Sequence, residues 1–236
     1  MRLMPLMSTA LMFSISGSLF GQEWMEFASR EDRFTCLFPG PPKVMETTYP
    51  SEYGAALPAR VYSFTQGQSR YSVTVVDYNQ LQRILTEKAK TCPVGDIVCR
   101  GGTNIGEGWW KVDMRGALVY ASWQLMQRDT KVTAYHFNVL ELVEGHQLQL
   151  TNADKSRTFA ATYMHENKLY IIESTVASGY PEPSWFSQSI GWLDENGNGL
   201  RYQDIYSNGY PAPSRVNRPL QPDSGRIDTP GASLGR

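Results

Sequence analysis

The chain of 236 residues is 41% hydrophobic and 12% aromatic, which is enough apolar material for one ordinary core. Its 22 Lys and Arg side chains nearly balance 23 Asp and Glu side chains. Because no strong electrostatic field results, the composition argues against a nucleic-acid partner, an anionic membrane surface and a polyanionic substrate.

The first 21 residues predict a secretory signal peptide. Arg2 is followed by an apolar and small-residue run from Leu3 to Phe20 and then by polar residues. Cleavage after Ser18 or Gly21 would start the mature chain between Leu19 and Gln22. An uncleaved membrane anchor is the alternative, but the run is short for a span and is diluted by polar residues. We therefore expect a periplasmic or secreted protein with no stable membrane insertion after signal removal.

The three cysteines are expected to include one disulfide, because export leads to an oxidising compartment. Cys92 and Cys99 are close in the sequence, and Pro93 and Gly95 between them allow the chain to reverse. We expect these two to be bridged, with Cys36 as the unpaired thiol on a strand that faces the core.

Short alternating segments and helical spacings predict an α+β fold for residues 22–206. The sheet is expected to be mainly antiparallel, with about seven or eight strands packed against two or three helices. In chain order, the predicted elements are strands at 34–38, from 43 and on both sides of Gly67, a helix at 81–90, a loop at 92–108, a helix at 113–128, a four-stranded meander turning at 144–145, 152–156 and 166–167, and an amphipathic helix at 183–193.

Residues 207–236 predict a disordered tail. They hold five prolines and four glycines and offer little that could enter a core.

The segment Phe27 to Val44, "FASREDRFTCLFPGPPKV", resembles the opening of a group of uncharacterised exported bacterial proteins. The order of elements is similar to that of the PsbP/Mog1-like α/β/α sandwich. This resemblance implies an architecture and no particular activity, because that fold hosts members with unrelated roles.

One stretch has the beginning of a calcium loop. Asp194, Asn196, Asn198 and Gly199 match positions 1, 3, 5 and 6 of the EF-hand pattern, where oxygen ligands surround a tight glycine turn. The match fails at position 12, where Ile205 stands in place of the bidentate glutamate. We therefore expect a turn into a short strand and no tight calcium site, with the first three of these residues as the metal candidates to test.

The histidines offer a second candidate. A turn at 144–145 would place His136 more than about 20 Å from His146, so the three histidines are not expected to form one zinc site. His146 and His165 would instead lie at the same end of the meander, each beside a glutamate. That arrangement allows a cluster of two imidazoles and two carboxylates.

Other chemistry finds little support. No nucleophile has an evident base, and the segment Gly101 to Gly108 lacks the lysine of a phosphate loop. Trp109 and Trp110 could line a cleft or anchor the loop to the core. We expect no cofactor, and a non-enzymatic binding or accessory module of unknown partner. The alternative is a metal-dependent or hydrolytic enzyme that uses the His146 and His165 end of the sheet.

Overall fold

The computed structural model describes residues 24–96, 99, 114–207, 212–218 and 227–228. The predicted signal peptide and the pair Trp109 and Trp110 lie outside the described residues. Within them the fold is α+β, as the sequence predicted, with three α-helices and two β-sheets.

The larger sheet is antiparallel, and its seven strands lie in the order β3-β4-β5-β9-β8-β7-β6. Along β4 and β5 buried side chains alternate with more exposed ones, and along β8 and β9 nearly all side chains are buried. These four strands are therefore the central strands of a sheet that is covered on both faces. The strands are β3 (Lys43–Pro50), β4 (Ala56–Gln66), β5 (Ser69–Asp77), β6 (Thr130–Leu140), β7 (Val143–Asn152), β8 (Arg157–His165) and β9 (Lys168–Val176).

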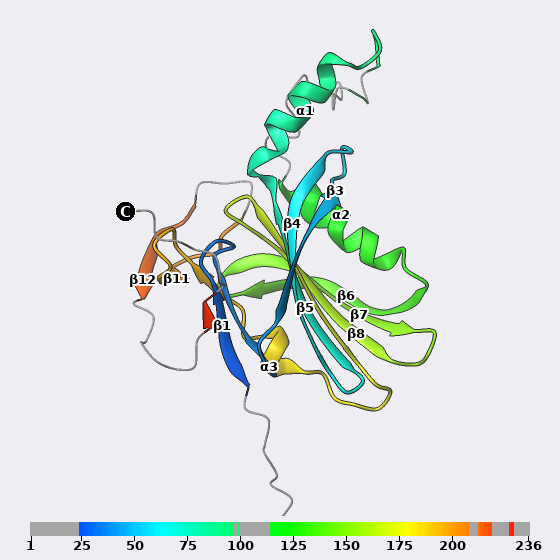
Figure 1. Ribbon diagram of the computed structural model, residues 1–236, viewed down its shortest axis with the longest axis vertical. Helices are drawn as coiled ribbons and strands as arrows, with labels where there is room; N and C mark the ends of the chain where they lie inside the picture. Colours follow the sequence, from blue (N-terminus) through cyan, green and yellow to red (C-terminus); the bar gives the residue numbers. More distant parts are fainter. Residues whose placement is uncertain (1–23, 97–98, 100–113, 208–211, 219–226, 229–236) are drawn as a thin grey trace, which may run out of the picture.

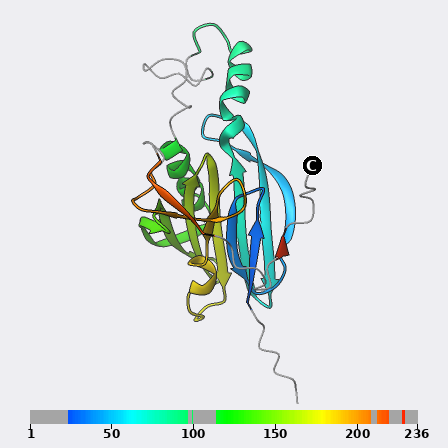
Figure 2. The same ribbon diagram turned by 90° about the vertical axis from the view of Figure 1, so that its left-hand side faces the viewer.

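A second sheet of six strands covers one face of the first. Its order is β12-β11-β10-β2-β1-β13, with β13 parallel to β1 and the other pairs antiparallel. Figure 2 shows it in front of the larger sheet. Its strands are β1 (Met25–Ser29), β2 (Phe34–Phe38), β10 (Gly191–Leu193), β11 (Gly199–Tyr202), β12 (Arg215–Arg218) and β13 (Ile227–Asp228).

The helices are α1 (Leu81–Lys90), α2 (Met114–Met126) and α3 (Ser184–Ser187). A short 3₁₀ turn, η1 (Tyr78–Gln80), precedes α1, and the Asp77 carboxylate caps it by accepting from the backbone N–H of Asn79. Ala117, Leu118, Ala121 and Leu125 of α2 are buried on one side of the helix.

Two apolar cores result. The first lies between the seven-stranded sheet and helices α1 and α2, and the second lies between the two sheets and includes Phe34, Tyr62 and Trp192. Figure 1 shows α2 along the sheet and α1 standing out from one end of the molecule. The fold therefore has three layers: the helices α1 and α2, the seven-stranded sheet and the second sheet.

Two expectations about these elements are wrong. The sequence suggested one sheet, but β1 and β2 pair with each other, β2 also pairs with β10 and β1 with β13, and neither pairs with the larger sheet. The helix expected at 183–193 is only the short α3, after which the chain enters β10. Gly191 and Trp192 pair with Thr35 and Phe34 of β2 in place of further helical turns. Trp185, expected in the core, is 68% exposed.

Part of the predicted tail is ordered. Residues 215–218 and 227–228 form β12 and β13, so the expectation of disorder does not hold there. β12 pairs with β11 from Arg215 to Arg218, and the Arg215 guanidinium also donates to Glu166 Oε1 at 2.7 Å. None of the helices in the described part of the chain is long and apolar enough to cross a membrane.

Candidate functional site

The candidate cluster of His146 and His165 does not form. The β6–β7 turn lies at Glu141 and Leu142 rather than at 144–145, and this changes the cross-strand partner of each residue in the hairpin by about six positions. His146 then lies opposite Thr162 in β8, whereas His165 ends β8 and pairs with Lys168. Since successive side chains point to opposite faces of a strand, the two imidazoles lie on opposite faces of the sheet.

The position of His136 also differs from the expectation. It pairs with Gln147, directly beside the pair of Phe137 with His146, and so is not far from His146 along the hairpin. It points to the other face of β6, however, and remains separate from His146. The three histidines therefore occupy three different environments.

His146 forms a serine–histidine pair that the sequence did not reveal. Its Nδ1 lies 2.8 Å from Ser122 Oγ and 3.2 Å from the Tyr135 hydroxyl. A serine within hydrogen-bond distance of an imidazole is the arrangement of an activated nucleophile. Burial lowers the pKa of His146, while the nearby Glu144 raises it.

This pair is closed to a substrate. Ser122 is only 1% exposed, and its hydroxyl also contacts Thr162 Oγ1 at 2.9 Å and the Leu118 carbonyl at 3.2 Å. The helical spacing of α2 could have revealed that Ser122 lies among buried residues, but its partner on β7 depends on the hairpin register. The pair fastens α2 to the sheet through hydrogen bonds.

His165 is buried on the other face, between the two sheets. Its ring lies against Trp192, with centroids 4.9 Å apart, and its Nε2 is 2.7 Å from the Tyr202 hydroxyl. Burial, together with the positive charges of Arg215 and Arg33, lowers its pKa to about 3. The imidazole is thus neutral at physiological pH and closed to solvent.

The buried carboxylate of Asp32 links the two sheets through several hydrogen bonds. It lies in the β1–β2 turn and accepts from Arg60 Nε at 2.8 Å, from the Tyr62 hydroxyl at 2.6 Å and from Lys168 Nζ at 3.3 Å. The Tyr170 hydroxyl donates to its backbone carbonyl at 2.8 Å. Two cations and two hydroxyls satisfy this one residue, so it is a structural junction and leaves no free base.

A hollow of about 340 Å³ adjoins this junction, and Glu31, Glu46 and Asp77 stand around it. Among the described residues, no group of three or more His, Cys, Asp or Glu side chains is arranged to hold a metal ion. The carboxylates of this hollow therefore do not converge on one point.

The calcium candidates lie in the hairpin turn between β10 and β11. The buried Asp194 carboxylate accepts from the backbone N–H groups of Asn196 and Asn198 at 2.9 and 2.8 Å. The side-chain amides of Asn198 and Asn217 add bonds at 3.2 and 2.9 Å. These bonds, set against the cost of burial, lower the pKa of Asp194. The carboxylate thus organises the turn from within.

The cysteines differ in environment. Cys92 and Cys99 form a disulfide with an S–S distance of 1.99 Å, just after α1. Cys36 is free and fully buried, and burial raises its pKa to about 12. A thiol of that kind is protonated and inert at physiological pH.

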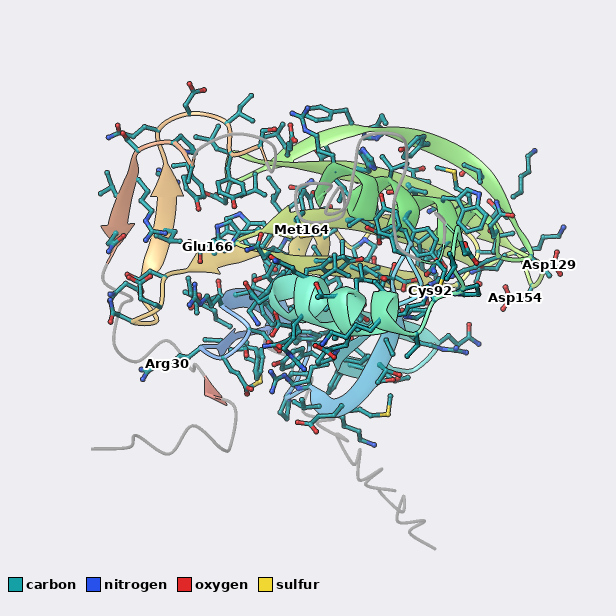
Figure 3. The ribbon with its side chains drawn as sticks, turned by 90° about the horizontal axis from the view of Figure 1, so that it is seen from above. Arg30, Cys92, Asp129, Asp154, Met164 and Glu166 are labelled. Carbon is teal, nitrogen blue, oxygen red and sulfur yellow. A yellow bond between two sulfur atoms is a disulfide. The ribbon has the colours of Figure 1, made fainter. Side chains whose placement is uncertain are left out.

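The open concave surface lies at one end of the seven-stranded sheet, where the β4–β5 and β7–β8 turns meet the segment that follows β9 (Figure 3, near the label Asp154). A hollow of about 1090 Å³ is lined there mainly by polar side chains. They include Arg70, Arg128, Asn152, Asp154, Ser156 and Thr158.

A second hollow of about 440 Å³ adjoins the first and is more aromatic. Both are lined by Gly67, Gln68 and Ala177, and the second also by Tyr71 and Tyr180. We call the two together the hairpin-end groove. The Arg157 guanidinium donates to the Tyr180 carbonyl and so ties one wall of the groove to β8.

Exposed aromatic rings stand beside this groove. The Tyr71 ring packs edge-on against Trp24 at 5.5 Å, and Trp24 packs against Trp185 at 6.4 Å. Tyr180 and Trp185 are 61% and 68% exposed, which is unusual for rings of this size. The groove thus combines hydroxyl, amide and guanidinium groups with apolar ring faces, and none of these residues was singled out from the sequence for this role.

Comparisons with known proteins add little. No family model matches the chain, and no curated protein matches it. The solution structure of cyanobacterial PsbP from Synechocystis sp. PCC 6803 aligns over 75% of this chain and 96% of its own, with 11% identity and a TM-score of 0.38. This is a weak resemblance in fold, and it carries no argument about function.

Proposed function

We propose that the protein is an exported, non-enzymatic binding module that holds an oligosaccharide in the hairpin-end groove. The observation that carries this proposal is the junction of a polar and an aromatic hollow around Gly67 and Gln68. Binding sites of this kind use apolar faces for contact area and a few polar groups for orientation.

The lining chemistry suits a sugar. A pyranose ring has an apolar C–H face that can stack on an exposed ring such as Tyr180, and hydroxyls that need paired donors and acceptors. Thr65 and Gln68, which are exposed, supply hydroxyl and amide groups, and the charges of Arg70 and Asp154 offset each other. A groove without a dominant charge is better suited to a neutral ligand than to a polyanion.

Export is supported by the Cys92–Cys99 disulfide, since such bonds persist mainly in oxidising compartments. The apolar run at the N-terminus of the sequence supports the same destination. We propose the periplasm or the extracellular space as the location.

The enzyme alternative has less support. A hydrolase would need a perturbed titratable group that is open to a substrate. Ser122 and His165 are both buried, and the pair His146 and His165 is divided by the sheet. The hairpin-end groove, in turn, contains no histidine or cysteine among its lining residues.

Calorimetry against a panel of neutral oligosaccharides, with peptides of similar length as comparison ligands, tests the proposal. Binding should weaken about tenfold or more in Tyr180→Ala, because a stacking surface is lost, and also in Gln68→Ala, because an exposed amide that both hollows share is lost. Met45→Ala, which truncates a similarly exposed side chain on β3, is the matched control and should bind like the unaltered protein. Binding of peptides alone, or sugar binding that both groove variants leave intact, would overturn the proposal.

A further inference from the structure

An open strand edge with apolar neighbours lies on the side of the molecule formed by α2 and β6. β6 is the last strand of the seven-stranded sheet, so one side of its backbone has no neighbouring strand in the described part of the chain. Five of the twelve large hydrophobic side chains exposed among the described residues belong to these two elements. They are Val119, Trp123, Val132, Tyr135 and Phe137.

These side chains share one face. Tyr135 and Phe137 lie opposite Leu148 and His146, which point toward α2, and Trp123 lies on α2 itself. An exposed apolar cluster along an open strand is a site of association, because unpaired backbone groups and apolar surface are both available there.

The backbone of β6 is arranged for pairing. The two-residue turn at Glu141 and Leu142, both with positive φ, makes Leu140 and Val143 a hydrogen-bonded pair. Alternate residues of β6 therefore bond to β7, and the peptide groups of Tyr135 and Phe137 point outward. An incoming antiparallel strand would bond to them and would replace the contact of His136 Nδ1 with the Phe137 carbonyl oxygen, which lie 3.1 Å apart.

We propose that the strand covering this edge is β6 of a second copy of the chain, paired antiparallel about a two-fold axis at His136. In this register Tyr135 of each copy lies opposite Phe137 of the other, which forms two cross-strand aromatic pairs on the α2 side. The two His136 side chains meet at the axis, at a position where the strands exchange no hydrogen bonds. A closed two-fold contact of this kind is the commonest form of homodimer.

Charge complementarity selects the second copy and this register. Lys131 is the only charged residue of β6, and Glu141 stands just beyond the other end of the strand. Antiparallel pairing about His136 brings Lys131 of each copy beside Glu141 of the other, so the dimer gains two such pairs. The bulge between Val132 and Ala134 shifts the register by one residue and leaves these side chains adjacent. Moving the axis to Tyr135 or Phe137 separates these charges.

Cysteine cross-linking tests the axis directly. In His136→Cys the two thiols would face each other across a non-hydrogen-bonded pair, where Cβ atoms lie about 4.5 to 5.5 Å apart, and mild oxidation should form an interchain disulfide. Met45→Cys, on the opposite edge strand β3, is the matched control and should form no interchain disulfide. The native cysteines do not interfere, because two are bridged and Cys36 is buried.

Light scattering tests the dimeric state, and exchanging the charges of Lys131 and Glu141 tests the register. The unaltered protein should be a dimer that Phe137→Lys dissociates. Lys131→Glu should raise the dimer Kd about tenfold, and the added change Glu141→Lys should restore it. A monomeric unaltered protein, or cross-linking of His136→Cys no faster than that of Met45→Cys, would overturn the proposal. The His136 variant alters only an exposed side chain, so this arm decides the matter even if Phe137→Lys fails to fold.

Discussion

The buried imidazole of His165 should make the protein lose stability as the pH falls below about 6.5. In the unfolded chain the histidine has its ordinary pKa of about 6.5, whereas in the fold burial and the charges of Arg215 and Arg33 hold the pKa to about 3. Between these values the unfolded state binds a proton that the folded state does not. By linkage, stability is therefore fully present above pH 6.5 and is lost as the pH falls.

The two pKa values set the size of the effect. At pH 5 the unfolded state gains about 2 kcal/mol from protonation of this one residue, and the ceiling, reached below pH 3, is about 5 kcal/mol. Every carboxylate in the protein also responds to pH, so the effect must be isolated by a variant. His165→Phe keeps a ring against Trp192 and cannot be protonated, and Tyr202 keeps its hydrogen bond with Arg215.

Urea unfolding at about pH 7.5 and about pH 5 measures the difference. At each pH the free energy of unfolding of His165→Phe is compared with that of the unaltered protein. Between the higher and the lower pH this difference should shift by about 2 kcal/mol in favour of the variant, whatever its value at the higher pH. His146→Phe is the control, with a smaller shift of the same sign, because this imidazole is only half-buried and Glu144 opposes the lowering of its pKa. An unchanged gap for His165→Phe would refute the reasoning.

Three further substitutions test the packing, each by urea unfolding. Asp32→Ala should cost about 3 kcal/mol, because it leaves the largely buried Arg60 and Lys168 without their shared carboxylate; a loss below about 1 kcal/mol would contradict this. Gly145→Ala should cost about 2 kcal/mol, because the new Cβ would lie 2.3 Å from a backbone oxygen of β8, and a neutral result would show that the strands can separate. Asp194→Ala should cost about 2 kcal/mol through the lost turn bonds, and calorimetry should detect no tight calcium binding before or after the change.

Helices α1 and α2 and several turns could be predicted because local sequence determines them. Leu81 and Leu85 lie one turn apart and face the core, which is the spacing that predicted α1. The turns at 152–156 and 166–167 contain residues that tolerate left-handed backbone, and Asn167 has a φ of 60°. In these segments the local preference and the tertiary fold agree.

The β6–β7 turn could not be predicted because its residues are not turn formers. Leu142 has a φ of 62°, which side chains of its type rarely adopt, while Gly145 three residues later is the residue that usually marks a turn. Gly145 is required for another reason: a side chain there would collide with Thr162 and Tyr163 of β8. Because register follows the turn, one misplaced turn was enough to misplace His136 and His146.

The second sheet and the Asp32 junction could not be read from the sequence because their partners are remote. Asp32 stands in a short charged segment that looks like an exposed turn, and Lys168, which binds it, is 136 residues away. β2 and β10 are likewise joined only by the tertiary fold. Local patterns show that such residues are turns or strands, but not which distant element satisfies them.

The distribution of polar groups favours recognition over catalysis. A general acid or base must combine a shifted pKa with access to a substrate. Here the groups with strongly shifted pKa values are buried: Cys36 and His165 lie between the two sheets, and Tyr49 and Tyr78 lie in the core beneath the helices. The hairpin-end groove is instead lined by side chains suited to hydrogen bonding and stacking, and loops held by a rigid sheet are where proteins most often place binding residues. The same sheet that separates His146 from His165 thus supports the groove at its end, and this arrangement is the basis of the binding role that we propose.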